Sequence, residues 1–190
     1  MNLDSGAVDL SGISLNGGSA SISLASTAVE LNESTKLGFV AVDVAAGQQL
    51  TSLSSVINDM IVTGDGTLIL TGNLSGEFSL GANSTISTID LRGTTLPASL
   101  DLADFAENSE IIISYSQAND LSVVGDLSNN ILRVDLDGVS DGYEITNFDY
   151  SAADGNDRVI FDFGESGGKT ITLDVDSAIE LGLGEDTFQS

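Results

Sequence analysis

Short apolar strand cores recur along the middle of the chain at a nearly constant step. A first set of these cores lies at residues 68–70, 89–91, 111–113 and 132–136. A second set lies between them at residues 78–80, 100–102, 121–124 and 143–145. Within each set the step is roughly 20 to 24 residues, which is typical of the units of a stacked solenoid. The pattern therefore predicts a repeating unit of two short strands and two turns.

A single unit of this size buries too little apolar surface to be stable alone, whereas stacked units join their inward Leu, Ile and Val side chains into one core. Gly and Asn accept positive φ at low cost, and they occupy the expected corners, for example at Gly72 and Asn129. We predict an all-β fold, a parallel β-solenoid (β-helix or β-roll) with coils of about 20 to 24 residues. The alternative is a β-sandwich, whose short strands are also separated by turns about every 8–12 residues.

The solenoid makes a specific prediction about strand order. The strand at residues 111–114 should lie parallel to the strands at residues 89–91 and 132–136, and between them. On this interpretation Ile112, the middle residue of an Ile-Ile-Ile run, is expected to lie in the core. Antiparallel hairpins between these neighbours would contradict the solenoid.

By pattern the chain divides into three segments. Residues 1–62 form a β-rich N-terminal segment, residues 63–147 hold the solenoid repeats, and residues 148–190 form an acidic C-terminal block. Near the end of the first segment, apolar residues recur at steps of three and four, which favours an amphipathic helix over residues 49–61. Another coil of short strands is the alternative for that stretch.

The charge of the chain excludes several classes of partner. Its 29 acidic and five basic residues give a formal net charge of −24 at pH 7. Nucleic-acid binding needs clustered Lys and Arg, and binding to an anionic membrane surface needs the same. No stretch approaches the roughly 20 apolar residues of a spanning helix, so we expect no membrane insertion. A chain of this charge repels itself unless cations screen or bind it.

The residue types present also limit the chemistry. The chain has no Cys and no His, which removes the usual zinc and copper ligands and the Ser-His and Cys-His nucleophile pairs. Carboxylates are plentiful, but aromatic residues make up only 5% and Trp is absent, so a sugar-stacking surface is thin. The sequence therefore predicts a non-enzymatic protein. Asp, Asn and backbone carbonyls suit Ca²⁺, which is the cofactor we expect.

Aspartates gather toward the C-terminal third of the chain. Like charges held close together raise each other's pKa and cost stability unless a cation neutralises them. The alternative is that each Asp forms a turn and caps its own backbone. The candidate Ca²⁺ ligands are Asp135, Asp137, Asp141, Asp149, Asp154 and Asp157.

Two motifs in this region resemble known families. Residues 152–160, Ala-Ala-Asp-Gly-Asn-Asp-Arg-Val-Ile, resemble the Ca²⁺-binding nonapeptide G-G-x-G-x-D-x-U-x of RTX proteins. The resemblance implies that Asp157 is a side-chain ligand and that Asp154 and Gly155 supply carbonyls. Residues 141–163 are similar to a block near the end of many proteins exported by type I secretion. That similarity implies an uncleaved C-terminal secretion signal within residues 148–190.

These observations lead to an expected function. The first thirty residues lack a basic n-region and a long apolar run, so we predict no cleaved N-terminal signal peptide. We expect a structural segment of a secreted cell-surface protein, of the S-layer or adhesin type, whose folding or assembly depends on Ca²⁺. Its partners would be further copies or other surface proteins. The alternative is an extracellular module that binds glycan or protein, with Tyr115 or Tyr143 on a concave face.

Overall fold

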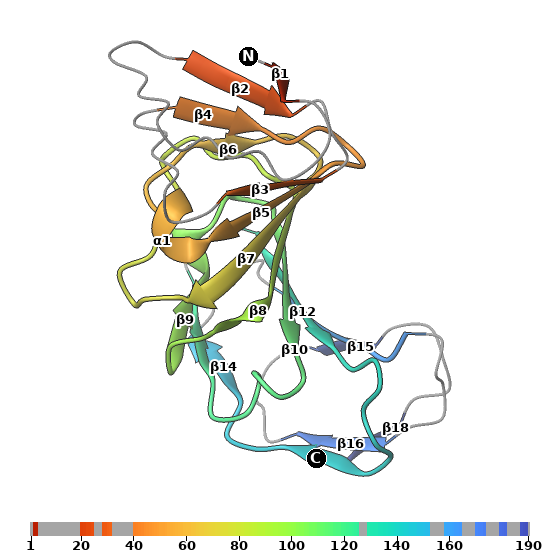
Figure 1. The fold of residues 1–190 in the computed structure, drawn as a ribbon. Helices are drawn as coiled ribbons and strands as arrows, with labels where there is room; N and C mark the ends of the chain where they lie inside the picture. The colour runs from red at the N-terminus through yellow and green to blue at the C-terminus, as the bar shows by residue number, and fades with distance from the viewer. Residues whose placement is uncertain are drawn as a thin grey trace.

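The computed structural model of the chain describes residues 2–3, 20–24, 28–31, 40–125, 129–152, 158–164, 170–173, 179–181 and 187–189. Nearly all regular structure in these residues is β-strand, and all the strand pairs are parallel. In Figure 1 the coils stack from the N-terminus at the top to the C-terminus at the bottom. No helix in the described ranges is long and apolar enough to cross a membrane.

The largest sheet has eight strands in the order β17-β15-β12-β10-β8-β7-β5-β3. Each strand comes from a different coil, so the sheet forms one continuous face of a solenoid. The predicted parallel β-solenoid is thus confirmed and the β-sandwich alternative is wrong. The strands are β3 (Ala28–Leu31), β5 (Gln49–Leu53), β7 (Thr67–Asn73), β8 (Thr88–Thr95), β10 (Glu110–Ser114), β12 (Ile131–Asp135), β15 (Arg158–Asp162) and β17 (Ile179–Leu181).

Three smaller parallel sheets form the other faces of the coils. The first is β1-β2-β4-β6, made of β1 (Asn2–Leu3), β2 (Ala20–Leu24), β4 (Val40–Asp43) and β6 (Val62–Thr63). The second is β14-β11-β9, made of β9 (Ser99–Asp101), β11 (Ser122–Val124) and β14 (Asp149–Ala152). The third is β13-β16-β18, made of β13 (Tyr143–Ile145), β16 (Thr170–Leu173) and β18 (Thr187–Gln189).

The predicted strand order around β10 is confirmed. Ile111 is in register with Ile89 on β8 and with Leu132 on β12. All three side chains are fully buried. Because side chains alternate between the two faces of a strand, this register stacks the inward Leu, Ile and Val residues of successive coils into one core.

The expectation that Ile112 lies in the core is wrong. Ile111 and Ile113 are fully buried, whereas Ile112 lies on the outer face and is partly exposed. In a run of three Ile residues, side chains must alternate between the two faces of the strand, but the run itself does not show which of them face the core. The neighbouring strands set the phase, because Ile112 is in register with the polar residues Asp90 and Arg133.

The coils differ in length. Register partners Leu50 and Leu68 are 18 residues apart, Ile111 and Leu132 are 21 apart, and Leu132 and Val159 are 27 apart. The longest coil contains both β13 and β14. β14 pairs with β11, whereas β13 pairs with β16 in a different sheet. Residues 143–145, which we grouped with the 121–124 strand, therefore belong to another face.

The predicted helix over residues 49–61 is wrong for most of its length. Residues 49–53 are strand β5, and only α1 (Ser54–Ile57) is helical. Leu50 pairs with Val29 and Leu68, which extends the sheet through this coil. Leu50 in β5, Ile57 in α1 and the later Met60 are all buried. Their spacing along the sequence is the same as that of the inward residues of a longer helix.

The predicted strand at residues 78–80 is also absent. Phe78 N donates to Ser75 O across 3.1 Å, so residues 75–78 form a turn. The chain rejoins the stack immediately afterwards, where Leu80 N donates to Asp104 O across 2.8 Å. Residues 78–80 therefore occupy the expected place in the coil without forming a ladder.

A buried polar column lies at one corner of the coils. Ser109 N donates to Oδ1 of Asn130, 2.9 Å away, and Asn130 Nδ2 donates to Leu102 O at 3.0 Å. Ser109 Oγ also donates to Ile86 O at 2.7 Å. Both polar side chains are fully buried and hydrogen-bonded, so they hold three successive coils in register.

The eight-stranded sheet crosses both boundaries that we placed by pattern, at residues 62 and 147. β5 and β7 pair across the first boundary, and β12 and β15 pair across the second. The three segments therefore differ in sequence character while sharing one continuous sheet.

Candidate functional site

The structure describes four of the six predicted Ca²⁺ ligands. Asp135 ends β12, and Asp137 follows in the next turn. Asp141 lies in the turn before β13, and Asp149 begins β14. Asp137, Asp141 and Asp149 are exposed. Asp154 and Asp157 lie outside the described residues.

Asp135 already has partners for both carboxylate oxygens. Its Oδ2 lies 2.5 Å from Arg92 Nη1, and its Oδ1 accepts the backbone N–H of Asp137 at 2.8 Å. In the part of the chain that the structure describes, no group of three or more acidic, His or Cys side chains is arranged to hold a metal ion. Asp135 is thus paired with a guanidinium and with a backbone N–H in this structure.

Asp135 belongs to a network of ion pairs on the outer face of the eight-stranded sheet. Arg92 Nη2 lies 2.7 Å from Asp90 Oδ2, in addition to its contact with Asp135. Arg133 lies 2.5 Å from Glu110 and 2.7 Å from Asp162. Since β10 lies between β8 and β12, Arg92 reaches past a whole strand. The two arginines thereby link β8, β10, β12 and β15.

The pairing shifts the pKa values of these groups. Burial alone would raise the pKa of Asp90, but hydrogen bonds from the side chain and backbone of Arg92, with the Arg92 charge, hold it below its usual range. Burial would likewise lower the pKa of Arg133, but Glu110 and Asp162 raise it. Both arginines stay charged, and their donors are directed at carboxylates.

A shallow hollow of about 520 Å³ lies over this network. Its lining includes both arginines together with Asp135 and Asp162. Four carboxylates surround two guanidinium groups, so the hollow is acidic overall. This arrangement links coils. The guanidinium groups of Arg92 and Arg133 are already paired with carboxylates, so the hollow is a poor site for an anion.

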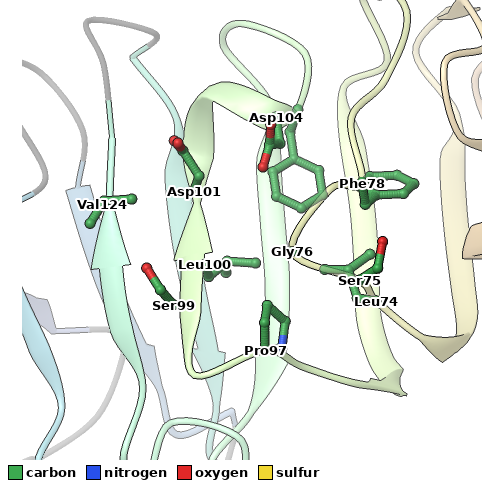
Figure 2. A pocket seen from close by; sticks show the side chains of 11 residues that line it. Leu74, Ser75, Gly76, Phe78, Pro97, Ser99, Leu100, Asp101, Asp104 and Val124 are labelled. Carbon is green, nitrogen blue, oxygen red and sulfur yellow. The ribbon is translucent and has the colours of Figure 1, made fainter.

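A second cavity, of about 400 Å³, lies beside β9, the edge strand of the β14-β11-β9 sheet. Figure 2 shows Asp101 and Asp104 at one end of the cavity and Pro97 at the other. The facing wall is the turn at residues 75–78. The lining residues are Leu74, Ser75, Gly76, Phe78, Pro97, Ser99, Leu100, Asp101, Asp104, Phe105 and Val124.

The two carboxylates of this cavity differ in environment. Asp101 ends β9, and its Oδ1 accepts the N–H of Ala103 at 3.0 Å, which caps the 3-10 turn η1 (Leu102–Asp104). Asp104 ends that turn. Burial, and then the neighbouring charge of Asp101, raise the pKa of Asp104 to about 6. At neutral pH the cavity therefore has two negative charges beside an apolar wall that includes the Phe78–Phe105 ring pair.

Sequence reasoning missed Asp101 and Asp104. The available signal was an acidic residue at each end of a short Asp-Leu-Ala-Asp run after a strand. The cavity itself is lined by the turn at residues 75–78 in the preceding coil, which runs into the place where we predicted a strand at residues 78–80.

The two tyrosines proposed for glycan binding lie together. The rings of Tyr115 and Tyr143 meet edge to face with centroids 4.9 Å apart, and Asn119 Nδ2 donates to the Tyr143 hydroxyl at 2.8 Å. Both rings are partly buried and pack against the core. They therefore form a packed pair rather than two separate exposed rings.

Comparison with known proteins gives no relative. No protein-family model matches the chain, and no curated protein or solved structure matches it either.

Proposed function

We propose that the chain is a non-enzymatic structural segment of a secreted cell-surface protein, of the S-layer or adhesin type, that assembles with further copies or with other surface proteins. The observation that supports the proposal most is the continuous eight-stranded parallel sheet, built from one strand per coil. A solenoid of this kind is extended by adding coils at its ends, since terminal strands have backbone groups available for another strand.

The charge and outer surface support the same proposal. A net charge of −24 favours solubility, and Arg92 and Arg133 link coils rather than attract an anionic partner. Export by a type I system, with the signal in residues 148–190, is part of the proposal and rests on the sequence resemblance alone.

Assembly is tested by sedimentation velocity and electron microscopy over a range of protein concentrations. β3 is the last strand of its sheet within the described ranges. Thr67 N donates to Gln48 O, so the peptide group of Gln48 faces β7. Because peptide groups alternate in direction along a strand, those of Gln49 and Thr51 face β3. In the register of β3 with β5, the N–H of Glu30 then points away from β5. Glu30→Pro should therefore reduce end-to-end assembly and leave the fold intact.

The matched control is Glu30→Thr, which removes the same charge and keeps the backbone donor. Assembly should survive in Glu30→Thr and be lost in Glu30→Pro. A chain that stays monomeric at all concentrations, or assembly that both variants leave unchanged, would contradict growth through this edge.

The proposed role of Ca²⁺ rests on residues 152–160. If Ca²⁺ binds the folded state there, it raises the free energy of unfolding by about 2.7 kcal/mol when its concentration is a hundredfold above Kd. Thermal unfolding in millimolar CaCl₂, against NaCl of equal ionic strength, separates binding from screening. Asp157→Ala should abolish the stabilisation, whereas Asp135→Ala should leave it, because Asp135 already pairs with Arg92. Equal unfolding temperatures in the two salts would remove Ca²⁺ from the proposal.

The alternative, a module that binds glycan or protein, is supported by the Tyr115–Tyr143 corner. Asn119 contacts both the Tyr143 hydroxyl and the backbone N–H of Thr146, so an amide and two rings meet at one accessible place. A glycan array with the purified protein tests this function. Binding that is lost in Tyr143→Ala and kept in Tyr150→Phe would favour it over assembly.

A further inference from the structure

We propose that the cavity beside β9 is a docking site for a short extended peptide that carries a basic side chain and adds to the β9 edge as a parallel or antiparallel strand. The proposal is independent of self-assembly, because it concerns a side face of the coils and not their ends. It rests on the backbone of β9, the turn that faces it and the two carboxylates at one end.

The backbone of β9 has hydrogen-bonding groups directed at the cavity. Ser122 N on β11 donates to Ala98 O at 3.0 Å. In a parallel ladder successive residues direct their peptide groups to opposite sides, so Ala98 and Leu100 face β11. Ser99 and Asp101 then direct their N–H and C=O groups the other way, toward the turn at residues 75–78.

That turn leaves the edge of β9 without a neighbouring strand. The backbone bonds Leu74 N to Thr95 O and Leu80 N to Asp104 O bracket the gap, at 3.0 and 2.8 Å. Between them, within the described residues, no backbone hydrogen bond joins residues 75–79 to residues 96–103. Unpaired strand edges recruit extended peptides, and main-chain hydrogen bonds then supply much of the affinity.

The length of the gap sets the length of the ligand. β9 spans three residues, Ser99–Asp101, which corresponds to roughly 10 Å of extended chain, and the peptide groups of Ser99 and Asp101 face the opening. The cavity of about 400 Å³ lies in the lower part of the range for ligand sites, about 300–1,000 Å³. A segment of about three residues therefore fits.

Charge decides which peptide is favoured. Asp101 and Asp104 lie together at one end of the cavity, and the other lining residues are uncharged. Burial raises the pKa of Asp104 to about 6, so the desolvated carboxylate gains more than an exposed one from an incoming cation. A Lys or Arg side chain on the peptide would meet both carboxylates, whereas an acidic side chain would be repelled.

The test uses the full chain and capped pentapeptides, Thr-Val-Lys-Val-Thr as the probe and Thr-Val-Glu-Val-Thr as its charge-reversed control. Amide signals are followed by two-dimensional NMR during titration. We expect saturable shifts at Ser99, Asp101 and the turn at residues 75–78 with the Lys peptide, and at least tenfold weaker binding of the Glu peptide. A Lys peptide with N-methylated backbone amides should bind at least tenfold more weakly, because it cannot pair with a strand.

Variants of the protein separate the carboxylates from general charge. Asp101→Asn/Asp104→Asn should weaken Lys-peptide binding about tenfold, and Asn still offers an acceptor to the Ala103 N–H. The matched control, Asp65→Asn/Asp137→Asn, removes two exposed charges elsewhere and should leave binding unchanged. Asp104→Asn alone covers the case in which the double variant fails to fold, and it should weaken binding at least threefold.

Four results of the peptide titrations would overturn the proposal. These are equal affinity for the Lys and Glu peptides, full binding of the N-methylated peptide, shifts confined to other parts of the molecule, and equal losses in the two double variants. If the signals of Ser99 and Asp101 shift with protein concentration alone, a second copy fills the cavity, and the peptide ligand is then wrong.

Discussion

The same coils build the eight-stranded sheet and the three-stranded sheet of β9, β11 and β14, yet only the first is unbroken from β3 to β17. On the large sheet, each coil between β3 and β17 contributes a strand, and Arg92 and Arg133 link strands on its outer face. On the small sheet, the turn at residues 75–78 ends the ladder at β9. Repeat spacing therefore stacks the coils, while local turn chemistry decides which faces become continuous sheets.

The largest effect on stability should come from the buried residues of the eight-stranded sheet. Ile111→Ala removes a fully buried side chain and should lower the free energy of unfolding by about 2–5 kcal/mol. Ile112→Ala, one residue along and on the outer face, should cost less than about 1 kcal/mol. Chemical denaturation of both variants measures the difference. Equal losses would mean that the two faces of β10 do not differ as described.

The next effect concerns the corner column. Asn130→Ala leaves the N–H of Ser109 and the C=O of Leu102 without their side-chain partner in a buried place, and should cost about 1–3 kcal/mol. Asn73→Ala, at an exposed position near the end of β7, is the control and should cost under about 0.5 kcal/mol. A loss at Asn130 no larger than at Asn73 would show that the column contributes little to coil register.

The sequence was sufficient to predict the stacking but not the details of each coil. The steps between residues 68, 89, 111 and 132 identified four strands and their order, because inward apolar residues must align from coil to coil. The phase of the Ile-Ile-Ile run was missed, since alternation has two phases and the neighbouring strands choose between them. The helix over residues 49–61 was wrong for a related reason: a strand followed by one helical turn gives the same apolar spacing.

The candidate sites were harder to predict than the fold. Asp135 ends β12, and its partner Arg92 is 43 residues away in sequence and two strands away in the sheet. A local count of acidic residues cannot detect such a partner. Asp101 and Asp104 were missed because their cavity depends on a turn in the preceding coil. Both cases need contacts between coils, which a single unit of the repeat does not contain.

A smaller effect concerns the ion pairs on the outer face of the large sheet. Removing Arg133 with Arg133→Gln leaves Glu110 and Asp162 without their shared cation. In a double-mutant cycle with Glu110→Gln, the coupling energy should be about 0.2–1 kcal/mol at low salt. It should be smaller in 0.5 M NaCl, because the Debye length falls from about 30 Å at 0.01 M to less than about 10 Å. Coupling that is absent at low salt would reduce the network to a surface coincidence of charges.

The smallest effect concerns Asp104, beside the three-stranded sheet of β9, β11 and β14, and it depends on pH. The pKa of Asp104 is raised from 3.8 to about 6, so the folded state binds this proton more tightly than the unfolded chain. The associated stability is present at low pH, and it is lost as pH rises through about 6, because ionised Asp104 is then held beside Asp101. Asp104→Asn should therefore raise the Tm slightly, by about 1–3 °C, at pH 7.5 and leave it nearly unchanged at pH 4.

Thermal unfolding of Asp104→Asn at the two pH values measures this directly, with Asp65→Asn as the exposed control. Asp65 is exposed and does not line the cavity, so its replacement should change the Tm at pH 7.5 only by the small amount that the loss of one surface charge produces. If Asp104→Asn lowers the Tm at pH 7.5, the ionised carboxylate stabilises the folded state, in spite of its burial and of the charge of Asp101. The gap beside β9 would then be a stable feature of the coil that needs no ligand to relieve its charge.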